Sequence, residues 1–227
     1  MKLSGHSNHC HALTLQEVLV VVAVLFAAMF FLLPALARSE DLARIKCVNN
    51  LKQVGLAYNL FAKDHDGRFP YGQTNTLAFQ NDRSAWVHFL TLSNELGSAT
   101  RLTCPADRER VDNLSVDFSS RTNIGSFGLQ FKRNAAISYW VGLNADVTRP
   151  VSLLAGDRNL TTNSGKWSGS VLTVTSSRLP AWTKGIHVES GDVVLADGSV
   201  QQFNTRSLQA HTSNYVWLTN RLLMPMP

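Results

Sequence analysis

One stretch near the N-terminus limits what this chain can fold into. From Val18 to Ala37 no charged or strongly polar side chain interrupts the sequence, and this is about the twenty residues that a helix needs to cross a bilayer. A core helix of a globular protein is a poor explanation, because no face of the run is polar. The run therefore predicts either a cleaved targeting signal or a retained membrane anchor.

Both explanations find support in the flanking residues. Lys2 supplies a positive start, and Ala35-Leu-Ala37 has the small-x-small form of a signal-peptidase site, which would give a mature start at Arg38. Glu17 favours the anchor: a carboxylate at the edge of a spanning helix is costly and usually has a partner, whereas a cleaved signal has no use for it.

The residues around Glu17 resemble a known processing junction. Ala12-Leu-Thr-Leu-Gln-Glu17 is similar to the type III leader junction of prepilins and pseudopilins, with Ala12 in place of the usual Gly and Leu13 in place of the usual Phe or Met. The resemblance implies cleavage between Ala12 and Leu13, N-methylation of Leu13, and assembly roles for Thr14, for Glu17 as fifth mature residue and for Pro34 as residue 22. In this family the glutamate is thought to pair with a neighbouring subunit's amine.

Further motifs narrow the resemblance to a prepilin-type group that is abundant in planctomycete and verrucomicrobial bacteria. The matching stretches are Leu33-Pro-Ala-Leu-Ala-Arg38, Cys47-Val-Asn-Asn-Leu-Lys-Gln-Val-Gly-Leu-Ala57, Asp66-Gly-Arg-Phe-Pro70, Cys104-Pro105, and His187 followed after nine residues by Asp197-Gly198. Members are often labelled as type II secretion pseudopilins. The segment from about Asp107 to Pro180 has no specific match.

After Ala37 the pattern becomes amphipathic, with apolar residues at steps of three and four as far as Phe61. One helix is therefore expected from about Leu15 to Lys63, ending near Gly67 with Pro70 beyond it. The predicted domains are a leader at 1–12, a transmembrane and spine helix at 13–64, and a globular head at 65–227.

The head is expected to contain short strands. Runs rich in β-branched or aromatic residues occupy Ser138–Gly142, Val151–Ala155, Val171–Thr175 and Asp192–Ala196. Asp197-Gly198 predicts a two-residue hairpin to Ser199–Phe203, and Val216–Leu223 suggests a short helix. The predicted fold class is α+β and pilin-like, with a long N-terminal helix, membrane-spanning in its first half, packed against a small antiparallel sheet.

Two of the three cysteines follow the apolar run. Cys47 lies on the apolar face of the expected helix, and Cys104 lies in a loop before Pro105. A disulfide between them would tie the helix to the head; the alternative is two buried free thiols. Cys10 would leave with the leader.

The sequence offers little for catalysis or metal binding. His187 and Asp197 supply two members of a triad, but a serine in a nucleophile elbow is missing, so no enzyme activity and no catalytic residue are expected. These cysteines do not have zinc-site spacing, and no metal or other cofactor is expected. Calcium occurs in some major pseudopilins, so the resemblance leaves calcium open, with no residues assigned.

The function expected from the resemblance is that of a structural subunit, a pseudopilin or prepilin, in a type II secretion or type IV pilus-like filament. The expected partners are a prepilin peptidase, other pilin or pseudopilin subunits, an inner-membrane assembly platform and membrane lipid. A formal charge of +5 without a Lys/Arg block argues against nucleic acid. The expected location is the bacterial inner membrane, single-pass, with the head in the periplasm or on the cell surface. The alternative is a membrane-anchored or secreted monomeric binding module that uses the leader only for targeting.

Overall fold

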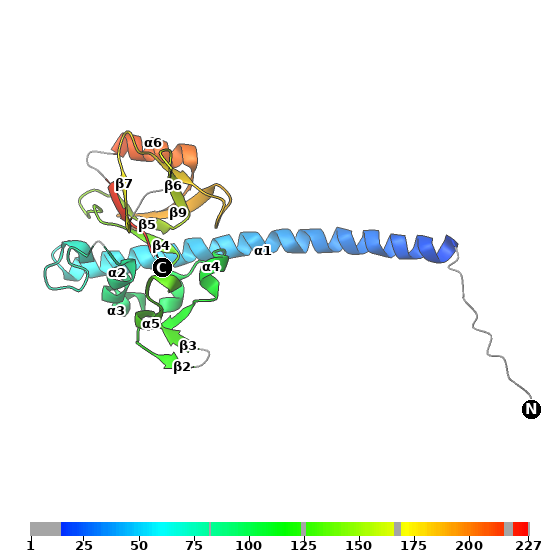
Figure 1. The fold of residues 1–227 in the computed structure, drawn as a ribbon, viewed down its shortest axis with the longest axis horizontal. Coiled ribbons are helices and arrows are strands. Elements are labelled where there is room, and N and C mark those ends of the chain that lie inside the picture. Colours follow the sequence, from blue (N-terminus) through cyan, green and yellow to red (C-terminus); the bar gives the residue numbers. More distant parts are fainter. Residues whose placement is uncertain (1–14, 82, 124–125, 166–168, 216–219, 227) are drawn as a thin grey trace, which may run out of the picture. The chain divides into compact units, whose positions relative to one another are not determined.

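A computed structural model of the chain describes residues 15–81, 83–123, 126–165, 169–215 and 220–226 (Figure 1). Within these ranges the side chains of residues 30–40 and 126 are not described. The chain divides into two compact units, Met1–Asp41 and Leu42–Pro227. The boundary falls inside the first helix, α1 (Leu15–Asp64), so the last part of this helix belongs to the second unit.

Helix α1 ends where the sequence predicts a helix stop. The Gly67 N–H donates to the carbonyl of Ala62 at 2.8 Å, and Asp66 and Gly67 take positive φ values of 52° and 70°. This closing turn satisfies carbonyls that the last helical turn leaves open. Asp66 and Gly67 therefore serve as a helix-ending turn.

Short helical segments follow α1 along the chain. They are η1 (Pro70–Gly72), α2 (Ala85–Thr91), α3 (Ser93–Leu96), η2 (Ala99–Leu102), α4 (Arg108–Val111), α5 (Leu129–Lys132), η3 (Arg133–Ala136) and α6 (Thr205–Tyr215). In Figure 1 the second half of α1 runs between the group α2, α3 and α5 on one side and the main sheet with α6 on the other.

The main sheet has six antiparallel strands in the order β10-β9-β5-β4-β11-β7. Its strands are β4 (Tyr139–Gly142), β5 (Leu153–Asp157), β7 (Val171–Val174), β9 (Ser190–Leu195), β10 (Val200–Asn204) and β11 (Asn220–Leu223). Two smaller sheets are built from β1 (Ser115–Asp117), β2 (Thr122–Asn123) and β3 (Ser126–Gly128), and from β6 (Leu160–Thr162) and β8 (Pro180–Trp182).

Both faces of the main sheet are covered, and the alternation of side chains shows how. Tyr139 and Val141 of β4 belong to a core shared with α1, whereas Trp140 between them belongs to a second core that includes Leu208 of α6. Successive strand residues point to opposite faces. The sheet is therefore a middle layer, with α1 on one face and α6 with the β6–β8 pair on the other.

The predicted fold class is wrong. The second unit has a six-stranded sheet covered on both faces and two additional sheets, in place of a small antiparallel sheet leaning on one helix. In the part of the chain whose side chains are described, no helix matches the expected membrane-spanning half. The prediction underestimated the sheet because strand β11 was expected to be helical and because the pairing of the other five strands into one sheet depends on contacts between distant parts of the chain.

Two local predictions also need correction. The hairpin between β9 and β10 has a three-residue loop, Ala196 to Gly198, because Leu195 and Ser199 still pair by a backbone hydrogen bond of 2.9 Å. Gly198 takes the left-handed conformation, φ 85°, as such loops require. The suggested helix at 216–223 is instead strand β11 over its last residues; residues 216–219 lie outside the described part.

The hairpin turn packs closely on α1 at Gly55. A Cβ atom on Gly55 would lie 2.5 Å from Cγ2 of Val194 and 3.3 Å from Cα of Gly198. We therefore expect Gly55→Ala to lower the free energy of unfolding by about 1–2 kcal/mol, since overpacking outweighs the gain in helix propensity. Urea unfolding measures this change. Gly72→Ala is the control, because its Cβ would meet only Arg68 Cβ at 3.9 Å; equal effects in the two variants would contradict the close packing.

Candidate functional site

The residues of the predicted leader junction fall at the edge of the described chain. Ala12, Leu13 and Thr14 lie outside the described residues. Glu17 lies in the first turn of α1, where a negative charge is favoured by the exposed N–H groups of the helix start. Pro34 falls within the bounds of α1, but its side chain lies outside the description.

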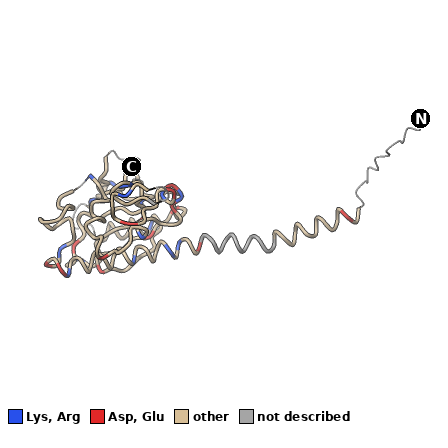
Figure 2. The backbone as a smooth tube through the Cα atoms, turned by 90° about the horizontal axis from the view of Figure 1, so that it is seen from below, with Lys and Arg blue, Asp and Glu red and all other residues tan. Residues whose placement is uncertain are grey.

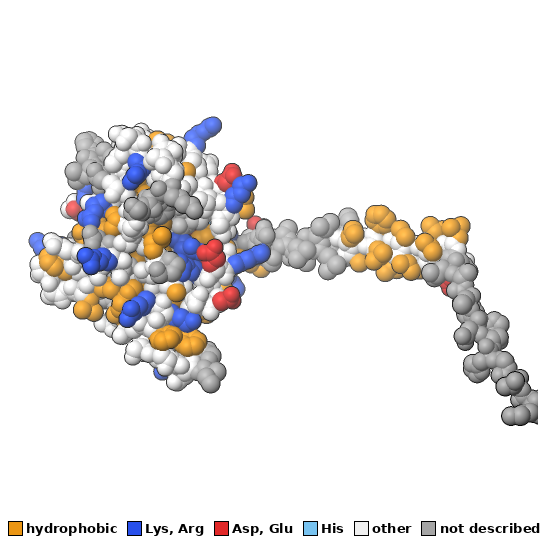
Figure 3. All heavy atoms as spheres, viewed as in Figure 1, with side chains coloured by type: hydrophobic (Ala, Val, Ile, Leu, Met, Phe, Trp, Pro, Cys, Tyr) orange, Lys and Arg blue, Asp and Glu red, His pale blue; other side chains and the backbone are white. Residues whose placement is uncertain are grey.

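Residues 15–29 of α1 form an apolar surface that no other described residue of the first unit covers. All side chains of residues 15–29 are exposed, and ten of them are large and apolar. Leu15 is 79% exposed, Phe26 69% and Leu25 57%. Figure 3 shows these apolar side chains along the helix, and Glu17 is the only charged residue among them (Figure 2). We call residues 15–29 the apolar segment.

The predicted inner-membrane location is contradicted. In the part of the chain whose side chains are described, no helix is long and apolar enough to cross a bilayer.

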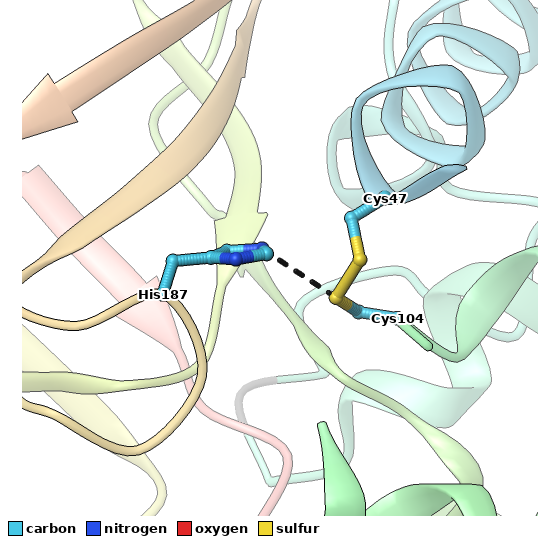
Figure 4. A group of neighbouring side chains, drawn as sticks. All are labelled: Cys47, Cys104 and His187. Carbon is cyan, nitrogen blue, oxygen red and sulfur yellow. Dashed lines mark hydrogen bonds between the residues drawn. A yellow bond between two sulfur atoms is a disulfide. The ribbon is translucent and has the colours of Figure 1, made fainter. Parts of the chain in front are cut away.

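A disulfide joins the two cysteines for which a bridge was expected. Cys47 projects from α1 and Cys104 from the loop after η2, their Cα atoms are 4.8 Å apart, and both residues are fully buried (Figure 4). The bond closes a ring across 57 positions of sequence. It anchors the second half of α1 to the segment that leads into α4.

His187 points from the loop between β8 and β9 toward this disulfide (Figure 4). Its Nε2 lies 3.6 Å from Sγ of Cys104, 3.5 Å from Oδ2 of Asp157 and 3.7 Å from Oδ2 of Asp192. The His187 and two aspartate side chains are at most 4% exposed. We call Asp157, His187 and Asp192 the His–Asp cluster.

The sequence motif had paired His187 with Asp197, and the structure gives the two residues different surroundings. Oδ1 of Asp197 accepts the Ser199 N–H at 2.8 Å within its own hairpin turn. His187 is buried beside Asp157 and Asp192 instead. The motif therefore joins a buried histidine to a tight turn that packs on α1.

The sheet brings the two aspartates of the cluster together. Asp157 ends β5 and Asp192 lies in β9, and these strands are neighbours, with Gly156 opposite Val193. Asp157 Oδ2 accepts the backbone N–H of Asp192 at 2.7 Å. This bond fixes the Asp157 carboxylate beside its neighbour.

Arg44 of α1 is the cation next to the cluster. Its Nη2 lies 3.7 Å from Oδ1 of Asp192 and donates to the Ser190 hydroxyl at 3.2 Å. With the amide of Gln202 oriented so that its oxygen faces Arg44, that oxygen also accepts from the guanidinium. Arg44 thereby connects α1 to strands β9 and β10 through an ion pair and hydrogen bonds.

Burial dominates the acid–base behaviour of the cluster. It raises the pKa of Asp157 well above the usual range, an effect that the Asp192 N–H opposes. Burial also raises the pKa of Asp192, against the attraction of Arg44. The pKa of His187 is lowered to about 4, first by burial and then by Arg44. Burial therefore favours the neutral form of each of these three groups.

Arg158, which follows Asp157 in the chain, forms a partly buried ion pair with Asp107. The Arg158 guanidinium donates from Nε and Nη2 to both oxygens of Asp107, at 2.7 and 2.8 Å, and from Nη2 to Glu109 at 2.5 Å. Sequence reasoning missed Asp107, Asp157, Arg158 and Asp192. The signal that could have drawn attention to Asp157 and Asp192 is a carboxylate inside or at the end of an otherwise apolar or glycine-containing strand.

Comparisons with known proteins add no assignment: no protein-family model, no curated protein and no solved structure matches this chain.

Proposed function

We propose that this chain is a structural subunit of a filament of the type II secretion or type IV pilus kind, matured by a prepilin peptidase. The observation that carries the proposal is the apolar segment: fifteen consecutive helical residues with exposed side chains, all of them apolar except Gln16 and Glu17 near the start. The residues from Ala12 to Glu17 support it, because they resemble the junction at which such subunits are processed.

We assign the same segment of neighbouring subunits as the partner that covers this surface. Fully burying one large apolar side chain stabilises by about 1.5–3 kcal/mol. If half of the ten exposed large apolar side chains were buried, the stabilisation would exceed the lower end of the free-energy cost of association, which is about 4–15 kcal/mol. A helix that is apolar all round buries every face only when several neighbours surround it, which is the arrangement in a bundle of subunits.

In this arrangement Glu17 sets the position of each subunit along the bundle. A carboxylate among apolar helices is costly unless a cation lies close to it. We assign that cation to the amine that cleavage before Leu13 would create on a neighbouring subunit. The carboxylate and the amine could then form an ion pair at only one axial displacement between neighbouring subunits.

Leu25→Glu tests the proposal. A second carboxylate in the middle of the apolar segment would be buried without a partner, so we expect the amount of chain in sheared, pelleted filaments to fall at least tenfold. The unfolding midpoint of the second unit should not change, because residue 25 belongs to the first unit. Immunoblots of shear and cell fractions give the first quantity, and urea unfolding gives the second.

The matched control is Leu77→Glu, the same substitution at a residue of the second unit that is 71% exposed. Normal filament content with Leu25→Glu would overturn the proposal. A wild-type chain that stays monomeric in every fraction would favour a monomeric binding module instead.

A further inference from the structure

The His–Asp cluster has a feature that its hydrogen bonds leave unexplained. Within the described part of the chain, Oδ1 of Asp157 and both carboxylate oxygens of Asp192 are buried and accept no hydrogen bond. Oδ2 of Asp192 faces Nε2 of His187 at 3.7 Å. A buried carboxylate oxygen without a hydrogen bond costs free energy, and Arg44, 3.7 Å from the other Asp192 oxygen, is the only positive charge that contacts the cluster among the described residues.

The spacing of the three groups fits metal ligands better than hydrogen-bonded partners. Nε2 of His187 is 3.5 and 3.7 Å from the two aspartate oxygens, beyond the usual length of an N–H···O bond. One ligand atom from each of the three residues lies within 4.8 Å of the others. Ligands of a tetrahedral ion with bonds of about 2.0–2.1 Å are about 3.3 Å apart, so small side-chain movements bring these three atoms onto one ion.

We propose that Asp157, His187 and Asp192 form a binding site for a divalent transition-metal ion, with Zn²⁺ as the best fit. One imidazole nitrogen and two carboxylate oxygens are ligands that zinc accepts. Calcium and magnesium prefer oxygen ligands throughout. The sulfurs of Cys47 and Cys104 lie close to His187 but are bonded to each other, so they supply no thiolate ligand.

The surroundings of the cluster hold the ligands in place. The Asp192 N–H bonds to Oδ2 of Asp157, and Arg44 engages Oδ1 of Asp192, which leaves Oδ2 of Asp192 for the ion. Such outer contacts orient ligands and strengthen binding. The two carboxylates balance the charge of the ion, and the disulfide fixes the helix that carries Arg44. All of these residues belong to the second unit, so the proposed site contains no residue of the apolar segment.

Zinc titration of the full-length chain tests this site. The background variant should carry Asn in place of His6, His9 and His11, because histidines near the N-terminus are themselves potential zinc ligands. The buffer should contain no reductant, so that the disulfide stays closed. We expect calorimetry to show one zinc ion per chain, an increase of the melting temperature with zinc, and Co²⁺ absorption bands of a four-coordinate site.

His187→Gln should weaken zinc binding at least 100-fold and abolish the zinc-dependent rise of the melting temperature. His211→Gln is the control, since His211 instead contacts the Val151 carbonyl at 3.0 Å. If His187→Gln does not fold, Asp192→Asn provides the same test with almost unchanged shape. A background chain that binds no zinc at 100 µM, or a folded cluster variant that binds it as tightly as the control, would overturn the proposal.

Discussion

Replacing both Cys47 and Cys104 by alanine should lower the free energy of unfolding by about 4 kcal/mol. The bond closes a ring across 57 positions, and the loss of that constraint on the unfolded chain has about this magnitude in the chain-entropy model. Both cysteines are fully buried, so the missing sulfurs add a packing loss. Urea unfolding followed by circular dichroism gives the difference.

Cys10→Ala is the control for this experiment, because it leaves the Cys47–Cys104 bond in place. The same double variant should also loosen the surroundings of His187, whose Nε2 lies 3.6 Å from the Cys104 sulfur. A loss below about 1 kcal/mol for the double variant would contradict a stabilising role of the disulfide.

Glu17→Gln should reduce the amount of chain in filaments at least tenfold while leaving the second unit as stable as before. The substitution keeps the size of the side chain and removes its charge. In the proposed bundle it would leave a neighbouring amine buried without its carboxylate, which costs about 3–5 kcal/mol when one partner of a buried pair is lost. Quantitative immunoblots of shear fractions measure the effect.

Glu189→Gln is the matched control, because Glu189 is an exposed glutamate of the second unit, 3.7 Å from Lys184. Normal incorporation of the Glu17 variant would exclude the assigned role. Equal losses in both variants would show that the assay responds to charge in general.

Local signals predicted individual elements of the fold but not their assembly. The apolar steps between Leu42 and Phe61 and the stop at Gly67 match the second half of α1. Runs of β-branched or aromatic residues located β4, β5, β7 and β9 to within two residues, and the turn at Asp197-Gly198 located β10 to within one. These signals depend on residues that are neighbours in the sequence, whereas the order of strands in a sheet depends on contacts between residues that are far apart in the sequence. Strand β11 lies between β4 and β7 in the sheet although it is far from β4 in the sequence. Its strand conformation depends on these two neighbours, which its own short sequence does not reveal, and that sequence suggested a helix.

The candidate site was likewise predicted only in part from the sequence. The positions of Cys47 and Cys104 predicted their pairing, because one lies on the apolar face of a helix and the other before a proline. His187 was identified through its spacing to Asp197, yet its contacts are Asp157 and Asp192. The pairing of β5 with β9 brings those carboxylates together. Pairing between strands that are far apart in the sequence cannot be predicted from short sequence patterns.

The most direct test of the filament proposal is site-specific photocrosslinking within the apolar segment. A benzophenone amino acid at Val22, a residue that is exposed in the structure, is activated in assembled material, and the adducts are mapped by mass spectrometry, with the same probe at Leu77 as reference. The proposal predicts two-chain adducts from Val22 that map to residues 15–29 of the second chain, and none at that segment from Leu77. Adducts from Val22 that never join two subunits through this segment would contradict it.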